Sequence, residues 1–306
     1  MNKIKAGHSN IEVPSIALGC MRISKMAHSD VNTLINTSLE QGIDFFDHAD
    51  IYGDGESETV FSKAIGMNDK IREKMILQSK CGIVRKGYFD FSKEHIIESV
   101  DGILGRLQTD YLDVLLLHRP DALVEPEEVA EAFNQLEASG KVRHFGVSNQ
   151  NPMQIKLLHK YVKQDLLFNQ LQLSIMRTGM IDQGFNVNMK VPSSVDHDGS
   201  ILDYCRLHDI TVQAWSPFQY GFFEGVFLDN PKFPELNKVI DRLANAYQVT
   251  NSAIAVAWIL RHPAKIQTII GTTNVQRVID MSKATDIEIT RAEWYEIYKA
   301  AGNVLP

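Results

Sequence analysis

Short apolar runs alternate with longer amphipathic segments along the whole chain, and this alternation limits the folds that the chain can adopt. The longer segments carry apolar residues at helical spacing, as at 29–41, 56–65 and 92–107. Strands that alternate with helices in one chain favour parallel strands joined by crossover helices. The runs that we interpret as strands are 15–21, 43–50, 74–82, 111–118, 142–149, 166–174, 210–217 and 266–271. Eight such units predict an α/β fold, a closed (β/α)8 TIM barrel.

An open, doubly wound parallel sheet is the main alternative, and the glycines of the chain disfavour it. That fold carries a glycine-rich loop, GxGxxG, after its first strand. The first strand here is followed instead by Cys20, Met21 and Arg22. Gly53 and Gly55 form a GxG without a third glycine, so we interpret them as a turn.

The chain is longer than the barrel alone requires. A barrel of this kind typically takes about 250 residues, whereas the chain has 306. The surplus predicts an N-terminal β-hairpin at 3–13 and an extra C-terminal helix at 291–301. The segments 175–199 and 218–234 show neither the helical spacing of apolar residues nor the short apolar runs of strands. Long irregular segments in compact domains are usually functional. No linker or shift in composition interrupts the chain, so we expect a single domain over 1–306.

Composition narrows the class of protein. Hydrophobic residues make up 44% and charged residues 23% of the chain, and the net charge of −7 argues against nucleic acid as the main partner. Cys20, Cys81 and Cys205 form no CxxC pair, so we predict reduced thiols and no metal site. No signal peptide and no run of about 18 apolar residues is present. A cytoplasmic protein without a membrane segment is expected, and its oligomeric state stays open.

Four ionisable residues stand at the ends of three successive predicted strands. Asp47 ends the second strand and Tyr52 lies in the loop after it. Lys80 ends the third strand and His118 the fourth. Because adjacent parallel strands of a barrel end side by side, these four side chains are expected to meet at the C-terminal rim, where barrel enzymes place their chemistry.

This set of residues suits proton transfer to an alkoxide. Free tyrosine has a pKa near about 10, and a nearby ammonium group lowers it by stabilising the phenolate. Lys80 can supply that charge, and Asp47 can keep Lys80 protonated and in place. His118 can orient a carbonyl oxygen beside Tyr52. The four residues therefore indicate a site with Tyr52 as general acid.

An ordered series of motifs resembles the aldo-keto reductases across nearly the whole chain, most closely the bacterial YdhF-like oxidoreductases. The motifs are FDHADIYG, ILQSKCG, DVLLLHRP, VRHFGVSN, FNQLQLS, QAWSPF and IIGTTNVQRV. The resemblance implies that Asp47, Tyr52, Lys80 and His118 are the family's catalytic tetrad, with Tyr52 as the proton donor. It also implies NAD(P)H binding without a Rossmann domain and hydride transfer to a carbonyl group.

The resemblance implies a set of cofactor-binding residues as well. Ser148, Asn149 and Gln170 would hold the nicotinamide carboxamide, and Trp215 would stack on the ring. The remaining contacts, along the pyrophosphate and at the adenosine phosphate, would come from Ser216, Pro217, Phe218, Gly271, Thr272, Thr273 and Arg277. The family's Pro-Lys-Ser triplet after the last strand is absent. We expect NADPH because Arg277 remains, with NADH also possible.

The same comparison places a substrate pocket beside the tetrad. Met21, Ile23, Tyr88 and Phe89 are expected to wall it, together with the loops at 175–199 and 218–233. Phe218, Tyr220, Phe222 and Phe223 would give it an aromatic lining. Such a pocket favours a small carbonyl substrate, an aldehyde, ketone or dicarbonyl, over a highly charged one.

Three functions remain for such a barrel. The first is an NADPH-dependent reductase that converts an aldehyde or ketone to the alcohol. The second is a nucleotide-binding regulatory subunit like the potassium-channel β subunits, which the complete tetrad disfavours. The third is a Schiff-base enzyme that uses Lys80. It is disfavoured because Asp47 would keep the amine charged, whereas imine formation needs a neutral amine.

Overall fold

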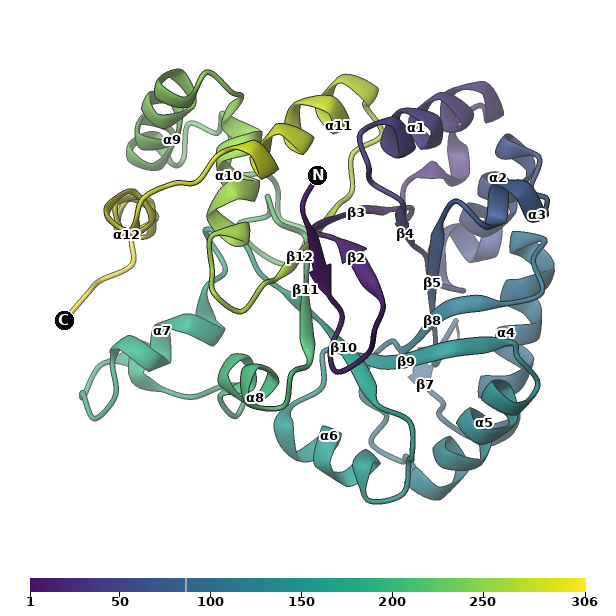
Figure 1. The fold of residues 1–306 in the computed structure, drawn as a ribbon. Helices are drawn as coiled ribbons and strands as arrows, with labels where there is room; N and C mark the ends of the chain where they lie inside the picture. Colours follow the sequence, from purple (N-terminus) through teal and green to yellow (C-terminus); the bar gives the residue numbers. More distant parts are fainter. Residues whose placement is uncertain (86) are drawn as a thin grey trace.

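The computed structural model describes residues 1–85 and 87–306, and in them eight parallel strands close into a barrel (Figure 1). The strands follow one another around the barrel in the order β3-β4-β5-β8-β9-β10-β11-β12, and β12 pairs with β3. They are β3 (Ile16–Gly19), β4 (Phe45–Asp47), β5 (Ile76–Cys81), β8 (Leu112–Leu117), β9 (Val142–Ser148), β10 (Leu166–Gln172), β11 (Thr211–Trp215) and β12 (Gln267–Ile270). The predicted TIM barrel is confirmed.

Strand β4 is shorter than the run 43–50 from which it was predicted. It ends at Asp47, but the backbone beyond it still bonds to β5: the N–H of His48 donates to the carbonyl of Gln78, and that of Asp50 to Lys80. These bonds hold the start of the loop against the neighbouring strand. The residues after Asp47 are therefore fixed in position although they lie outside the strand.

Helices surround the barrel and cover the apolar outer faces of its strands (Figure 1). Helix α2 keeps the bounds predicted for it, whereas α1 is shifted by one residue from the predicted 29–41 and α4 begins one residue after the predicted 92. The surrounding helices are α1 (His28–Glu40), α2 (Glu56–Ile65), α4 (Lys93–Leu107), α5 (Pro126–Ala138), α6 (Pro152–His159), α8 (Ile201–Leu207), α10 (Asn251–Leu260) and α11 (Val275–Ser282). Apart from α10, in which residues 253–259 are all buried, the surrounding helices bury one apolar stripe against the barrel, which explains the helical spacing of the sequence.

The predicted N-terminal hairpin closes one end of the barrel (Figure 1). Its strands are β1 (Lys3–Lys5) and β2 (Glu12–Pro14), paired antiparallel. Val13 is fully buried and packs with Phe45 and Phe168 inside the barrel. The hairpin thus covers the end opposite the strand termini at which the four ionisable residues lie.

The predicted C-terminal helix is α12 (Arg291–Ala300), which is held to α10 by two tryptophans. The rings of Trp258 and Trp294 stack 4.7 Å apart. Each indole N–H also donates to the backbone carbonyl of the other residue, at 3.1 and 3.0 Å. An additional helix, α9 (Pro234–Tyr247), packs against α10 and α12.

The segment 175–199 is more regular than its sequence suggested. It contains α7 (Gly179–Phe185) and a short 3-10 turn at Pro192–Ser194. Helix α7 makes under two turns, too few to show a helical period, and tertiary contacts fix it: Tyr298 of α12 donates to Asp182 at 2.6 Å. Two further elements were not predicted, α3 (Asp69–Arg72) and the ribbon of β6 (Ile83–Val84) with β7 (Tyr88–Phe89). No helix within 1–85 and 87–306 is long and apolar enough to cross a membrane.

Candidate active site

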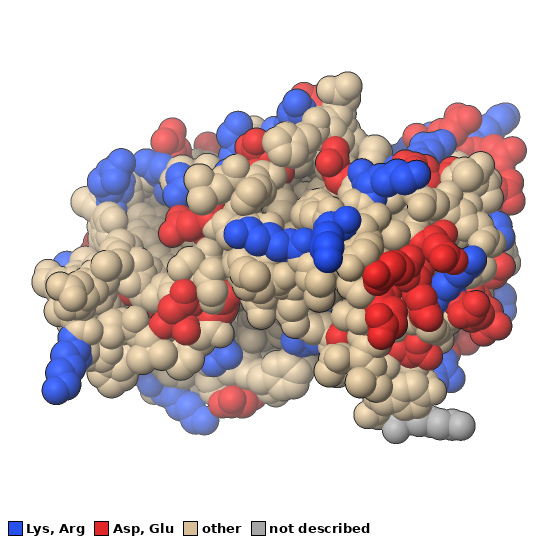
Figure 2. All heavy atoms as spheres, turned by 90° about the horizontal axis from the view of Figure 1, so that it is seen from below, with Lys and Arg blue, Asp and Glu red and all other residues tan. Residues whose placement is uncertain are grey.

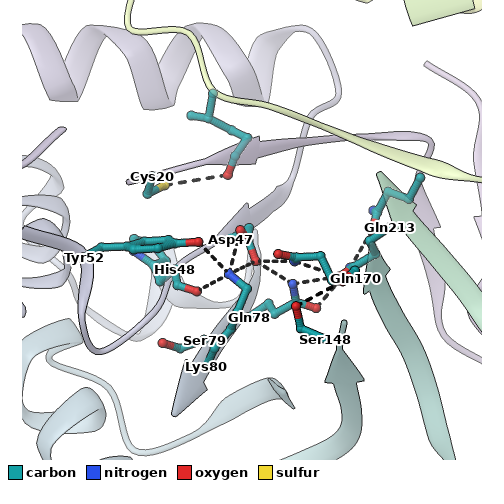
Figure 3. A network of polar contacts seen from close by, with 12 residues as sticks. Cys20, Asp47, His48, Tyr52, Gln78, Ser79, Lys80, Ser148, Gln170 and Gln213 are labelled. Atoms are coloured by element: carbon teal, nitrogen blue, oxygen red, sulfur yellow. Dashed lines mark hydrogen bonds and ion pairs between the residues drawn. The ribbon is translucent and has the colours of Figure 1, made fainter. Parts of the chain in front are cut away.

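Asp47, Tyr52 and Lys80 meet at the C-terminal rim of the barrel and point toward one another (Figure 3). Strands β4, β5 and β8 are adjacent, so Asp47, Lys80 and His118 come from neighbouring strand ends. Tyr52 begins the short turn Tyr52–Gly55 that follows β4. Lys80 is fully buried, and its Nζ lies 2.8 Å from Asp47 Oδ1, 2.7 Å from the carbonyl of His48 and 3.1 Å from the Tyr52 hydroxyl. The predicted convergence is therefore present.

The charges of this cluster differ in part from the expected ones. Burial works to lower the pKa of Lys80, but Asp47 and the contact with Tyr52 outweigh burial and raise it, so Lys80 stays charged. Burial raises the pKa of Tyr52, and the Lys80 charge offsets only part of that rise. The expectation that Lys80 brings the tyrosine pKa below its ordinary value is therefore wrong. Desolvation in the folded chain therefore favours the protonated form of Tyr52.

His118 lies beside the tyrosine as a neutral imidazole. Its ring is 5.9 Å from the Tyr52 ring, edge to face. Burial, with the charges of Lys80 and Arg119, holds the pKa of His118 well below its ordinary value. Its Nδ1 is buried and has no hydrogen-bond partner within 1–85 and 87–306. A neutral ring of this kind can donate one hydrogen bond without carrying a charge.

A chain of glutamines, absent from the sequence predictions, supports Asp47 from inside the barrel (Figure 3). The side-chain N–H groups of Gln78 and Gln170 both donate to Asp47 Oδ1, at 2.6 and 3.0 Å. The same two amides also donate to Gln213 Oε1, at 3.0 and 3.1 Å. Gln213 donates to Gln267 at 2.8 Å, and Gln267 to the carbonyl of Pro14 in the hairpin at 2.7 Å. The sequence did contain a sign of this chain, because each of the four apolar strands β5, β10, β11 and β12 includes one of these glutamines.

His48 and Asp50 flank this cluster without joining it. His48 is fully buried with its ring edge-on to Phe61, and burial lowers its pKa to about 3. Its contribution is its backbone carbonyl, which accepts from Lys80. Burial and the neighbouring Glu58 raise the pKa of Asp50 to about 7. Both residues shape the loop that carries Tyr52.

A cavity of about 760 Å³ opens over the cluster and extends to the start of α11. Asp47, Tyr52 and His118 line it, whereas Lys80 lies behind them. The residues predicted to bind the cofactor also line this one cavity: Ser148, Asn149, Gln170, Trp215, Ser216, Pro217, Phe218, Gly271, Thr272, Thr273 and Arg277. A volume of this size is typical of ligand sites, which span about 300–1,000 Å³.

Hydrogen bonds fix the side chains in the middle of the cavity. Asn149 adopts a left-handed backbone conformation, with φ of 57°. Its Nδ2 donates to Ser148 Oγ at 2.7 Å, and its Oδ1 accepts from Trp215 Nε1 at 3.1 Å, which sets the plane of the indole. Gln170 uses its N–H groups on Asp47 and Gln213, so its Oε1 is the atom left to accept from a ligand.

The far end of the cavity lies at the N-terminus of α11. Asn274 caps this helix by accepting from the backbone N–H of Arg277 at 3.1 Å. Thr272 Oγ1 accepts from the N–H of Asn274 at 3.1 Å and shapes the preceding turn. The first turn of the helix holds no acidic side chain. Backbone N–H groups and the positive helix end together favour an anion here.

Part of the predicted substrate pocket does not line the cavity. Met21 lines it, and Phe222 and Phe223 line it beside Trp215, at 6.2 and 6.3 Å between ring centres. Tyr88 and Phe89 do not: they are 52% and 43% exposed on β7, while Ile83 of β6 reaches the cavity in their place. Pairing into a ribbon turns the second strand outward. Ile23, Tyr220 and the whole segment 175–199 also lie outside the lining.

Several lining residues were missed by the sequence predictions. Arg119 directly follows His118, and Arg22 directly follows Met21. Their position next to predicted site residues could have indicated that both arginines line the cavity. Asp229, Asn251 and Ser252 also line the cavity, and none of them stands in a motif that pointed to a site. No three of the His, Cys, Asp and Glu residues described by the structure are placed to share a metal ion.

Comparison with known proteins agrees with this geometry. Residues 15–301 match the profile of the Aldo/keto reductase family. Oxidoreductase YdhF of Escherichia coli is 34% identical over 283 residues, covering 90% of this chain and 89% of that protein. A 6-dehydroglucose reductase of Agrobacterium fabrum is 32% identical over 304 residues, covering 95% of each chain. A crystal structure of an aldo-keto reductase from Klebsiella pneumoniae with NADPH is 25% identical, with a TM-score of 0.79 and coverage of 99% of this chain and 97% of that one. The chain belongs to the aldo/keto reductase family, as its motifs predicted.

Proposed function

We propose that this protein reduces an aldehyde or ketone to the alcohol with NADPH, using Tyr52 as the general acid. The observation that carries the proposal is the contact of Lys80 Nζ with both Asp47 and the Tyr52 hydroxyl at the floor of the cavity. A charged lysine aimed at a protonated tyrosine stabilises the phenolate that remains once the proton has left.

The residues of the cavity fit a nicotinamide nucleotide. Gln170 keeps one acceptor atom for a carboxamide, and Trp215 presents an indole whose plane is fixed by Asn149. The turn before α11 offers backbone N–H groups to a phosphate, and Arg277 stands in the first turn of that helix. The related enzyme from Klebsiella pneumoniae binds NADPH. When bound, such a cofactor supplies a hydride to the carbonyl carbon.

The protein's own groups handle the oxygen and its proton. Neutral His118 donates a hydrogen bond to the carbonyl oxygen and directs it toward Tyr52. As negative charge grows on that oxygen, the Tyr52 hydroxyl gives up its proton and the O–H bond of the alcohol forms. Lys80 compensates the resulting phenolate charge, and Asp47 keeps Lys80 in place. Phe222 and Phe223 form an aromatic wall of the cavity beside Trp215, against which the substrate would pack.

Nucleotide titration followed by turnover measurements tests the proposal. We expect NADPH to quench the fluorescence of Trp215, and we expect NADPH oxidation when small aldehydes and ketones are added. Absence of binding by both NADPH and NADH would refute the proposal. Tight binding without turnover on any carbonyl would favour the regulatory-subunit alternative, since that function needs the nucleotide and not the acid.

Replacing Arg277 with methionine is expected to weaken NADPH binding about 10- to 100-fold, because a hydrogen bond to a charged group contributes about 1.5–3 kcal/mol. NADH lacks the 2′-phosphate, so its affinity should change less than about threefold. Both dissociation constants are measured by fluorescence titration. Lys283→Met, just beyond the other end of the helix, is the matched control. Equal losses for the two nucleotides would mean that Arg277 does not select NADPH.

The rate of reduction is expected to be independent of pH through the neutral range. Reduction needs the protonated tyrosine, and burial raises the pKa of Tyr52 above its ordinary value of about 10, so the rate should fall only in more alkaline solution. Alcohol oxidation needs the phenolate and should rise steadily with pH from 7 upward. Profiles of kcat/KM against pH in both directions check this. A reduction rate that falls between pH 6 and pH 8 would assign the acid to another group.

A further inference from the structure

Arg119 lies in the cavity beside the proposed acid and has no partner within the described residues 1–85 and 87–306. It follows His118 at the end of β8 and is half-buried. Its guanidinium lies 5.6 Å from the centre of the Trp215 ring. It forms no hydrogen bond or ion pair with any described residue, whereas the buried Arg72 contacts Asp113 at 2.6 Å. The guanidinium nitrogens are not among the buried polar atoms that lack a partner, so their five donors face the cavity and are free to bind a ligand.

Neither of the two carboxylates that line the cavity pairs with Arg119. Asp47 is engaged by Lys80, and Asp229 accepts a hydrogen bond from Asn251 at 3.0 Å. Burial lowers the pKa of the Arg119 guanidinium, which is the expected effect on an uncompensated cation. Arg22, after β3, adds a second cation on the other side of β4 and β5.

The cationic cavity contrasts with the rest of the molecule. The net charge of the chain is −7. On the face drawn in Figure 2, acidic side chains gather in one patch while lysine and arginine side chains are dispersed. Positive charge at the site therefore does not reflect the overall composition. It is placed at the proposed reaction centre, where it attracts and orients an anion.

The position of Arg119 separates it from the cofactor's phosphates. Those are assigned to the turn after β12 and to α11, and three strands of the barrel, β3, β4 and β5, stand between β12 and β8. The Arg119 guanidinium lies instead 5.6 Å from the centre of the Trp215 ring, at the end of the cavity assigned to the nicotinamide. An anion bound there belongs to the molecule that is reduced.

We infer that the carbonyl substrate carries an oxyanion, a carboxylate or a phosphate, which Arg119 binds through two parallel N–H···O hydrogen bonds. This inference rests on the proposed reductase function and specifies its substrate class. It modifies the expectation from the aromatic residues, which favoured a small carbonyl compound over a highly charged one. The aromatic wall holds the carbon skeleton, and the guanidinium fork fixes the distance from the anion to the reacting carbonyl.

Two matched substrate pairs test the inference and distinguish the two oxyanions. One pair is 4-carboxybenzaldehyde with its methyl ester, and the other is glyceraldehyde 3-phosphate with glyceraldehyde. The wild-type enzyme with NADPH should prefer the anionic member of at least one pair about tenfold or more in kcat/KM, mainly through a lower KM. In Arg119→Met that preference should fall to about threefold or less, and Arg119→Lys should retain part of it.

Controls separate the role of Arg119 from general effects of charge. Arg242→Met, on α9, removes the same charge far from the cavity and should keep the wild-type preference. No preference in the wild type, or equal losses on both members of a pair in Arg119→Met, would overturn the inference. Loss of the preference in Arg22→Met but not in Arg119→Met would also overturn it. Turnover of the neutral members without preference leaves the reductase function standing, whereas no turnover on any aldehyde refutes that function itself.

Discussion

Replacing Tyr52 with phenylalanine is expected to lower the rate of carbonyl reduction about 10²- to 10⁴-fold, the usual contribution of a general acid. The variant loses one hydroxyl group, the one that lies 3.1 Å from Lys80 Nζ. The ring is retained, and with it the edge contact to His118. NADPH affinity should stay within about twofold of wild type, because Tyr52 lies at the carbonyl end of the cavity. Single-turnover rates and fluorescence titration measure the two effects separately.

The matched control for this variant is Tyr295→Phe. Tyr295 lies on α12, packs against Trp294 and is outside the cavity. The Tyr295→Phe variant should reduce carbonyls at the wild-type rate. That result would show that the loss of a tyrosine hydroxyl is not harmful in itself. If Tyr52→Phe retained more than about a tenth of the wild-type rate, the proton would have to come from another donor, with His118 the next candidate.

Replacing Lys80 with methionine is expected to lower the free energy of unfolding by about 3–5 kcal/mol, because it leaves Asp47 charged, buried and without its cation. Gln78 and Gln170 still donate to the carboxylate, but two amides do not replace an ammonium group. Turnover should also fall sharply, since the phenolate of Tyr52 loses its compensating charge. Equilibrium denaturation and steady-state kinetics provide the two measurements.

A double variant separates stability from activity. Asp47→Asn combined with Lys80→Met removes both charges, and we expect it to recover at least half of the lost unfolding free energy. It should not recover turnover, because no positive charge then faces the tyrosine. If Lys80→Met alone were as stable as wild type, the Asp47–Lys80 pair would carry little energy. If the double variant reduced carbonyls at the wild-type rate, the pair would have no part in catalysis.

Much of the fold and of the catalytic cluster could be predicted because both depend on local patterns. Apolar runs and helical spacing repeat regularly, and a closed barrel brings successive strand ends together. That geometry placed Asp47, Lys80 and His118 side by side from sequence positions alone. Tyr52 followed because the loop after β4 is short and bonded to β5.

The remaining features depend on tertiary structure. The direction of the Tyr52 pKa shift is set by how completely the folded chain excludes water, and no residue pattern reports that. Tyr88 and Phe89 were misplaced because the pairing of β7 with β6 decides which way they face. No sequence prediction was made for Arg119, and only the structure shows that its guanidinium forms no hydrogen bond or ion pair with residues 1–85 and 87–306. The predictions therefore located the cluster of Asp47, Tyr52, Lys80 and His118 better than the lining of the rest of the cavity.

The glutamine chain inside the barrel limits the routes by which a proton could return to the Tyr52 hydroxyl after the proposed reaction. Both ends of the chain, Asp47 and the carbonyl of Pro14, can only accept hydrogen bonds, so every amide between them is locked in one orientation. Amides do not ionise, and locked ones cannot hand a proton along. The glutamine chain therefore cannot conduct protons through the barrel interior to the cavity. If Tyr52 is the acid, as proposed, the proton that replaces the one it donates has to enter from the mouth of the cavity after the alcohol has left.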